Sequence, residues 1–124
     1  MIKATRNQLA NVKNPYQGDD RKVLCVCSAG LLRSPTMAKV FAEEFGYNTR
    51  SAGVSEDFAL IPVSEALISW ADEIVCAGAA HCHEIESQYD IGDKPMYSLN
   101  IPDSYSYNDA ELVELIKSAY LALD

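Results

Sequence analysis

The short apolar run from Val23 to Cys27 constrains the fold of this chain more than any other feature. Every side chain in the run is apolar, so a strand formed here would present apolar side chains on both faces. A strand of this kind is typical of the centre of a parallel sheet, which is covered on both faces. The run therefore predicts a layered α/β fold built around this strand.

The residues that follow predict a tight loop and then the start of a helix. Ser34 can cap a helix, and Pro35 suits its first turn. Apolar residues at positions 37, 40, 41 and 45 would share one face of that helix, and Gly46 would end it. The expected unit is thus a strand, a loop and a helix N-terminus.

The alternation of strands and helices continues along the chain. Further strands are expected at 47–52, 73–77 and 94–99, and further helices at 63–70, 79–88 and 112–121. Such alternation implies a parallel sheet covered on both faces, with the ligand site at the carboxyl ends of the strands, near the point where the strand order reverses.

The length of the chain, 124 residues, fits one domain. We expect that domain to span residues 21–124. Residues 1–20 are polar and end in a turn-like run, so we expect them to form an N-terminal arm.

The charge balance excludes two classes of partner. Ten basic residues against eighteen acidic ones give a net charge of −8. A surface that binds nucleic acid or an anionic membrane needs a basic patch, so we expect neither partner. Any anionic ligand of this chain must therefore be held by positive potential that is concentrated in a loop rather than spread over the surface.

The four cysteines of the chain are Cys25, Cys27, Cys76 and Cys82. Residues 1–20 lack the apolar stretch of a signal peptide, and no stretch of the sequence is long enough to span a membrane. We therefore expect a cytoplasmic protein, whose cysteines are core residues, redox groups or nucleophiles rather than disulfides. His81 and His83 flank Cys82, but these neighbours would point in different directions on a helix, so we expect no metal and no other cofactor.

The loop between Cys27 and Arg33 carries the groups that phosphoryl transfer through sulfur requires. A helix N-terminus and a neighbouring cation favour the thiolate form of cysteine, which is the nucleophile. Backbone N–H groups in a loop of small and apolar residues can turn inward and bind an anion. The planar fork of arginine binds two phosphoryl oxygens at once. We therefore interpret Cys27 as a nucleophile and Arg33 as the clamp of a site that phosphate or sulfate can occupy.

The residues expected to bind the substrate beside these two lie in the same loop: Ser28, Ala29, Gly30, Leu31, Leu32 and Ser34. The alternative is a buried strand cysteine followed by an ordinary strand-to-helix turn. The strand before the loop and the capped helix after it favour the phosphate site.

Residues 27–35, Cys-Ser-Ala-Gly-Leu-Leu-Arg-Ser-Pro, resemble the phosphate-binding loop of the low-molecular-weight protein tyrosine phosphatases. Ser-Ala-Gly at 51–53, Trp-Ala-Asp at 70–72 and Ile-Pro-Asp-Ser-Tyr at 101–105 are similar to other motifs of a short microbial branch of that family. The resemblance covers roughly residues 21–120. It implies a single flavodoxin-like domain with a four-stranded parallel sheet.

The resemblance also implies an activity. The chain would be a cysteine-dependent protein tyrosine phosphatase, a hydrolase of phosphomonoesters in phosphoproteins or small molecules. Cys27 would attack phosphorus and form a cysteinyl-phosphate, which water then hydrolyses. Arg33 and the loop amides would stabilise the transition state, and the hydroxyl of Ser34 would bind the thiolate. Ser34 can instead serve as a helix cap, or fill both roles.

The resemblance places the general acid at Asp103, within Asp103-Ser104-Tyr105, where the family has Asp-Pro-Tyr. The acid protonates the leaving oxygen. Asp109 is the competitor, but it lies where the last helix should begin. Tyr105 and Tyr107 are expected beside the pocket, where aromatic rings favour phosphotyrosine, or are half-buried loop residues.

Two loop residues depart from the family. Gly30 stands where most members have an asparagine that supports the loop, so this loop is expected to be looser, and Ser51 loses a partner. Leu32 stands where many members have a second, protective cysteine. Cys25 is a poor substitute, because it lies two residues before Cys27 on the same strand.

Two other functions remain alternatives. Arsenate reductases on the same scaffold use a loop cysteine together with a cysteine pair after the third strand, and Cys76 and Cys82 lie in about that region. A non-catalytic phosphate-binding module is the second alternative, against which the presence of Cys27 and Asp103 argues.

Overall fold

The computed structural model describes residues 21–28, 33–55, 59, 61–102 and 106–123. In these ranges the strands are β1 (Lys22–Cys27), β2 (Asn48–Gly53), β3 (Glu73–Cys76) and β4 (Met96–Ser98). The helices are α2 (Arg33–Phe45), α3 (Glu65–Trp70), α4 (Ala79–Gln88) and α5 (Ala110–Leu121). The expected N-terminal arm, residues 1–20, lies outside the described residues.

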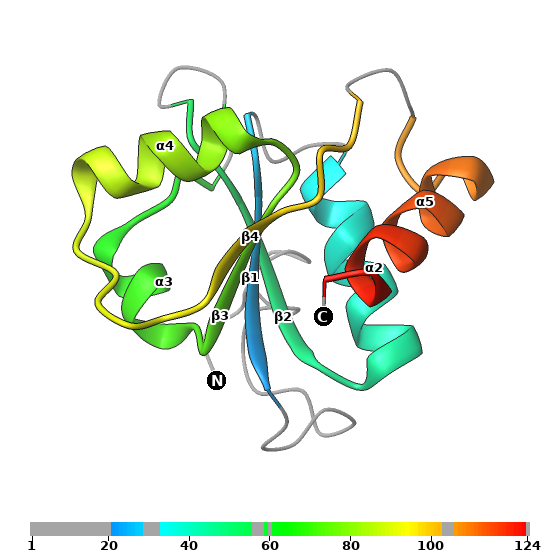
Figure 1. Cartoon of the computed structure of the whole chain (residues 1–124), viewed down its shortest axis with the longest axis horizontal. Coiled ribbons are helices and arrows are strands. Elements are labelled where there is room, and N and C mark those ends of the chain that lie inside the picture. The colour runs from blue at the N-terminus through cyan, green and yellow to red at the C-terminus, as the bar shows by residue number, and fades with distance from the viewer. Residues whose placement is uncertain (1–20, 29–32, 56–58, 60, 103–105, 124) are drawn as a thin grey trace, which may run out of the picture.

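The described strands form one parallel sheet in the order β2-β1-β3-β4 (Figure 1). The chain passes from β1 to β2 on one side and then crosses to β3 on the other. The strand order therefore reverses between β1 and β3, which is where parallel sheets hold their ligands. The prediction of a flavodoxin-like α/β fold with a four-stranded parallel sheet is confirmed.

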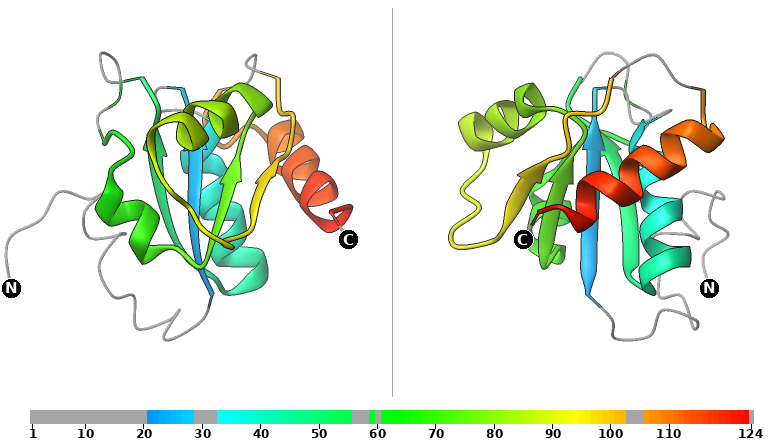
Figure 2. Two further views of the ribbon diagram at one scale, coloured as in Figure 1. Left: turned by 60° about the vertical axis from the view of Figure 1, so that its left-hand side comes forward. Right: turned by 45° about the vertical axis from the view of Figure 1, so that its right-hand side comes forward.

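Helices cover both faces of the sheet: α2 and α5 lie on one face, and α3 and α4 on the other (Figures 1 and 2). The central strand β1 supplies both interfaces. Its residues Val23, Cys25 and Cys27 pack toward α2 and α5, whereas Leu24 and Val26 pack toward α3 and α4. None of these five side chains is more than 3% exposed, as expected for an apolar run in a doubly covered strand.

The ends of several elements differ from the predicted ones, and side chains explain two of the differences. Helix α3 begins at Glu65 because Ser64 is its N-cap and accepts a hydrogen bond from Leu67 N at 3.3 Å. Strand β4 begins only at Met96, because the ring of Pro95 leaves that residue without an N–H and the Lys94 amide donates to the Ile91 carbonyl in a turn, at 3.2 Å. Gly46, with a φ of 71°, follows the end of α2 as expected.

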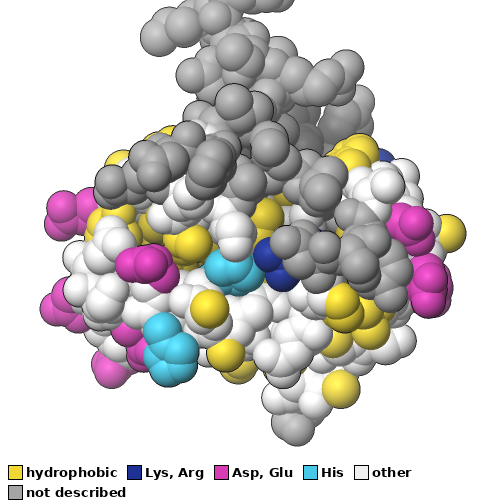
Figure 3. Space-filling model, turned by 90° about the horizontal axis from the view of Figure 1, so that it is seen from above, with side chains coloured by type: hydrophobic (Ala, Val, Ile, Leu, Met, Phe, Trp, Pro, Cys, Tyr) yellow, Lys and Arg dark blue, Asp and Glu magenta, His cyan; other side chains and the backbone are white. Residues whose placement is uncertain are grey.

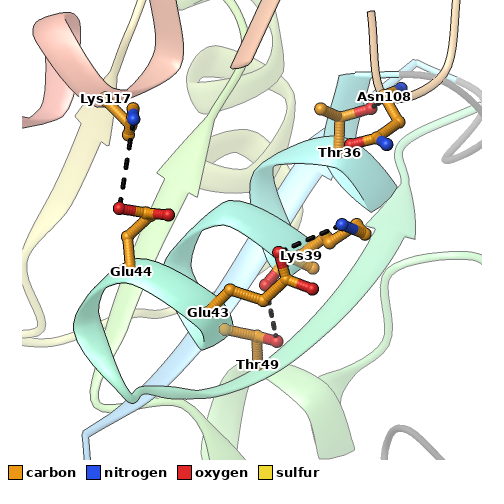
Figure 4. Close-up of polar contacts among 8 residues, drawn as sticks. Thr36, Lys39, Glu43, Glu44, Thr49, Asn108 and Lys117 are labelled. Carbon is orange, nitrogen blue, oxygen red and sulfur yellow. Dashed lines mark hydrogen bonds and ion pairs between the residues drawn. The ribbon is translucent and has the colours of Figure 1, made fainter. Parts of the chain in front are cut away.

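Polar contacts tie α2 to its surroundings (Figure 4). Thr49 Oγ1 of β2 donates to the Ala38 carbonyl at 3.0 Å. The amide of Asn108, just before α5, donates to Thr36 Oγ1 at 2.8 Å. These bonds fix the helix that follows the Cys27 loop against both its sheet and the segment that leads into α5.

None of the helices in the described ranges combines the length and the apolar character that crossing a lipid bilayer requires.

Candidate active site

The candidate site lies at the carboxyl end of β1, beside the point where the strand order reverses. Figure 3 looks onto this end of the sheet, where a histidine side chain and a basic side chain lie next to each other near the middle of the face. Because parallel strands end together, residues that follow β1, β3 and β4 are brought to the same region.

Cys27 is the last residue of β1 and is 3% exposed. Its thiol donates to Ser34 Oγ at 3.2 Å, and the Ser34 hydroxyl donates to the Ala52 carbonyl of β2 at 3.3 Å. Ser34 lies inside the first turn of α2 rather than in front of the helix, and it is completely buried. The cap position expected for Ser34 is therefore wrong, and its hydroxyl faces the Cys27 sulfur.

Arg33 begins α2 and is 8% exposed. Its Nη1 donates to the Ile101 carbonyl at 3.0 Å. Ile101 lies just beyond β4, so this bond connects the helix after the Cys27 loop with the segment in which Asp103 lies. The guanidinium is thus oriented by the protein itself, which reduces the entropy that binding an anion would cost.

Ser28 directly follows Cys27 and is an exposed residue. Its carbonyl accepts a hydrogen bond from Ser55 N at 2.9 Å, and its Oγ lies 3.0 Å from Nε2 of His81. From the sequence, His81 was considered only as a metal ligand. The missed signal is the spacing from Gly78 to His81, which is that of a helix N-cap and the third residue after it.

Several of the expected site residues lie outside the described part of the chain: Ala29, Gly30, Leu31, Leu32, Asp103 and Tyr105. The described residues on either side of 103–105 do meet at one helix, α2. Ile101 is held by Arg33, and Asn108 is held by Thr36. Both contacts come from the first turn of α2, so the two ends of the segment that contains Asp103 meet the helix that follows the Cys27 loop.

The other cysteines lie in two environments. Cys25 packs on the same face of the sheet as Cys27, and burial raises the pKa of its thiol well above the ordinary value. Cys76 packs on the opposite face, together with Cys82 of α4. A hydrogen bond from the Cys76 thiol, followed by burial, raises the pKa of Cys76, and the same bond lowers the pKa of Cys82.

Among the described residues, no group of three or more histidine, cysteine, aspartate or glutamate side chains could hold a metal ion.

Comparison with known proteins gives a result at the level of structure. No protein-family model matches the sequence, and no curated protein matches it either. Solved structures do match. Wzb of Vibrio vulnificus, in complex with benzylphosphonate, superposes with a TM-score of 0.66 at 19% identity over 82% of this chain and 95% of that one.

Two further solved structures broaden the likeness. The low-molecular-weight protein tyrosine phosphatase of T. tengcongensis matches with a TM-score of 0.62 at 20% identity, over 84% of this chain and all of that one (100%). The YwlE arginine phosphatase of Geobacillus stearothermophilus matches with a TM-score of 0.59 at 20% identity, over 82% and 92% of the two chains. This chain therefore has the fold of the bacterial low-molecular-weight protein tyrosine phosphatases.

Proposed function

We propose that this chain is a cysteine-dependent phosphatase that hydrolyses phosphomonoesters through a cysteinyl-phosphate intermediate. The observation that carries the proposal is the contact of the Cys27 sulfur with Ser34 Oγ, at 3.2 Å, where the central strand meets a helix N-terminus. Arg33, six residues after Cys27, is buried in the first turn of the same helix. Attack on phosphorus needs a nucleophile, and a helix N-terminus and a planar cation stabilise the negative charge of the transition state.

The proposed reaction has two steps. The Cys27 thiolate attacks phosphorus while Asp103 gives a proton to the leaving oxygen, and water then releases phosphate from the sulfur. Arg33 and the amides of the loop bind the three oxygens that carry the charge. We assign the remaining loop residues, Ala29 to Leu32, to this amide cradle.

Ser34 has a role in the proposed ionisation of Cys27. A hydroxyl group has one hydrogen. With Cys27 as a thiol, that hydrogen goes to the Ala52 carbonyl and the Ser34 oxygen accepts from sulfur. When Cys27 loses its proton, the Ser34 hydrogen can turn to the sulfur and stabilise the negative charge.

We propose protein phosphotyrosine as the substrate. Tyr107, which is 50% exposed, and Tyr105 would supply aromatic contacts for a phenyl ring. Because the same fold includes an arginine phosphatase, phosphoarginine is the substrate to compare. Hydrolysis of a phosphoarginine peptide faster than of a matched phosphotyrosine peptide would overturn this substrate and leave the proposed chemistry intact.

The reductase alternative gains no support from the positions of the cysteines. A disulfide relay would have to pass from Cys27 to Cys76 or Cys82. Cys27 packs toward α2 and α5, whereas the other two pack together on the opposite face of the sheet. We therefore do not propose arsenate reduction.

The decisive experiment is hydrolysis of p-nitrophenyl phosphate by the wild-type protein and by Cys27→Ser, with and without a chelator. We expect turnover by the wild type in both conditions. Cys27→Ser should lose turnover and still bind inorganic phosphate, because the amides and Arg33 remain. Cys82→Ser, a half-exposed thiol on α4, is the matched control and should keep full activity. Full activity of Cys27→Ser would overturn the mechanism, and phosphate binding without turnover by the wild type would indicate a binding module.

A further inference from the structure

His81 lies in the first turn of α4 and is 6% exposed. Its Nδ1 accepts a hydrogen bond from the amide of Gly78, the N-cap residue, at 2.9 Å. The imidazole thus fills the role that glutamate or glutamine has in a capping box, where the third helical residue reaches back to the N-cap amide. This bond explains why the ring is held in one orientation.

The bond from Gly78 also fixes the positions of the ring hydrogens. A nitrogen that accepts from an N–H carries a lone pair, and a neutral imidazole has its hydrogen on the other nitrogen. The hydrogen of His81 is therefore on Nε2, which lies 3.0 Å from Ser28 Oγ. His81 donates and Ser28 accepts, so the hydroxyl hydrogen of Ser28 points away from the ring.

Ser28 is held on its other side by β2 and its continuation. Its carbonyl accepts from Ser55 N, and the carbonyl of Cys27 accepts from Val54 N, both at 2.9 Å. The residue directly after the nucleophile is therefore fixed through its backbone from one side and through its side chain by α4 from the other. Ser28 is an exposed residue at the carboxyl end of the sheet, and its bond to His81 is partly buried.

We propose that His81 is a positioning residue of the phosphate site and acts through Ser28. By donating to Ser28 Oγ, it leaves the hydroxyl hydrogen of Ser28 free to bind an oxygen of the phosphoryl group held at Cys27. This inference rests on the proposed function. The pair belongs to binding rather than to bond breaking, because neither residue exchanges a proton with the reacting atoms.

The kinetic test uses variants that separate the two bonds of His81. His81→Leu removes both, and His81→Gln keeps an acceptor for Gly78 and a donor for Ser28. His81→Leu and Ser28→Ala should each raise KM for p-nitrophenyl phosphate, and the inhibition constant of inorganic phosphate, about tenfold with kcat little changed. His81→Gln should recover most of the loss. His83→Gln, on the exposed side of the same helix, is the matched control.

The double variant Ser28→Ala/His81→Leu distinguishes positioning from a general structural role. If His81 acts through Ser28, the double variant binds phosphate no more weakly than Ser28→Ala alone. An additional loss caused by His81→Leu in the Ser28→Ala background would overturn the proposal. A fall in kcat with KM unchanged would overturn it as well.

A measurement that does not depend on activity is the ¹⁵N NMR spectrum of the imidazole rings in the full chain. We expect His81 to carry its hydrogen on Nε2 and the Nε2 signal to shift in Ser28→Ala, with His83 unaffected. A hydrogen on Nδ1, or an unchanged signal, would overturn the pairing. Wild-type protein that neither binds phosphate nor hydrolyses the ester would overturn the proposed function instead, and the spectrum would still decide the His81–Ser28 contact.

Discussion

On the proposed function, Asp103 is the residue whose replacement separates leaving-group chemistry from nucleophilic attack. If it is the acid, Asp103→Asn should slow hydrolysis of alkyl phosphates about 100-fold or more, because a poor leaving oxygen needs a proton. An activated aryl ester should be affected far less. Asp109→Asn is the matched control: Asp109 caps α5 by accepting from Glu111 N at 2.9 Å, and asparagine caps a helix equally well. Steady-state kinetics on both esters would check this, and equal losses for Asp103→Asn would point to another acid.

Cys82 should be the more reactive member of the Cys76–Cys82 pair. Its pKa is lowered by the hydrogen bond from Cys76, and its side chain is half-buried, whereas Cys76 is completely buried. Iodoacetamide at mildly alkaline pH should therefore label Cys82 first, as read by peptide mass spectrometry. Cys76→Ala should slow the labelling of Cys82, and Cys76→Ser, which keeps a donor, should not. An unchanged rate in Cys76→Ala would show that the hydrogen bond does not govern the ionisation.

The sequence could predict a contact between two residues when both belong to one local motif. Cys27 and Ser34 are seven residues apart, and a strand, a loop and a helix are enough to bring them into contact. Ser28 and His81 are 53 residues apart, and Arg33 and Ile101 are 68 apart. The first contact depends on β3 lying beside β1, and the second depends also on β4 lying beside β3; no periodicity within these segments specifies either arrangement.

At the scale of elements, the first turn of α2 holds both ends of the segment that contains Asp103. Arg33 and Thr36 lie three residues apart on α2, and they bind Ile101 and Asn108 respectively. Asn108 has a φ of 59°, in the left-handed region that asparagine tolerates better than most residues. The helix that carries Arg33, the proposed clamp, therefore also holds the described residues on both sides of the proposed acid.

Thr36→Val should weaken this connection without changing the shape of the side chain. The amide of Asn108 would lose its bond to a completely buried oxygen, at a cost of about 1–3 kcal/mol in the free energy of unfolding. On the proposed function, kcat for alkyl phosphates should fall while the inhibition constant of phosphate stays the same. Thr49→Val is the matched control, because Thr49 also bonds α2 but at the Ala38 carbonyl (Figure 4). Urea unfolding and steady-state kinetics would check both variants. Equal losses of kcat in the two would show that the bond from Asn108 to Thr36 matters no more for turnover than the bond from Thr49 to Ala38.

The order and type of the elements followed from the sequence, whereas their ends and their arrangement did not. Alternating apolar runs and amphipathic segments predicted each strand and helix that the structure describes. Strand β4 is shorter than expected because the Lys94 amide donates to the Ile91 carbonyl in a turn and Pro95 has no N–H, which the apolar pattern alone does not reveal. The strand order β2-β1-β3-β4 likewise depends on crossovers between distant segments.

At the scale of the whole molecule, the buried carboxylate of Glu73 connects the sheet with α5 at the amino end of the strands. Glu73 of β3 is 3% exposed, pairs with Arg21 Nε at 3.2 Å, and accepts from the Tyr120 hydroxyl of α5 at 2.9 Å. Burial, together with hydrogen bonds to Tyr47 and Glu73, raises the pKa of Tyr120. Because a buried carboxylate needs partners, these contacts fix the last helix to the sheet at the end opposite the candidate site.

The buried thiol of Cys25 on the central strand makes the stability of the whole fold depend on alkaline pH. Burial, followed by the charge of Glu73, raises the pKa of Cys25 well above its ordinary value of 9.0. Above pH 9 the unfolded chain loses this proton and the folded chain keeps it. The free energy of unfolding should therefore be unaffected by Cys25 below pH 9 and should fall by about 1.4 kcal/mol per pH unit above it, until the folded thiol ionises.

Cys25→Ala should remove that part of the slope, although the smaller side chain costs stability at every pH. Val23→Ala is the matched control, because Val23 is equally buried on the same face of β1 and has no proton to lose. Urea unfolding from pH 7 to 11 should give parallel curves for Val23→Ala and the wild type, and a shallower decline for Cys25→Ala. If the free energy of unfolding falls with pH at the same slope in all three proteins, Cys25 ionises as readily in the folded chain as in the unfolded one. The central strand would then open to solvent at alkaline pH before the fold is lost.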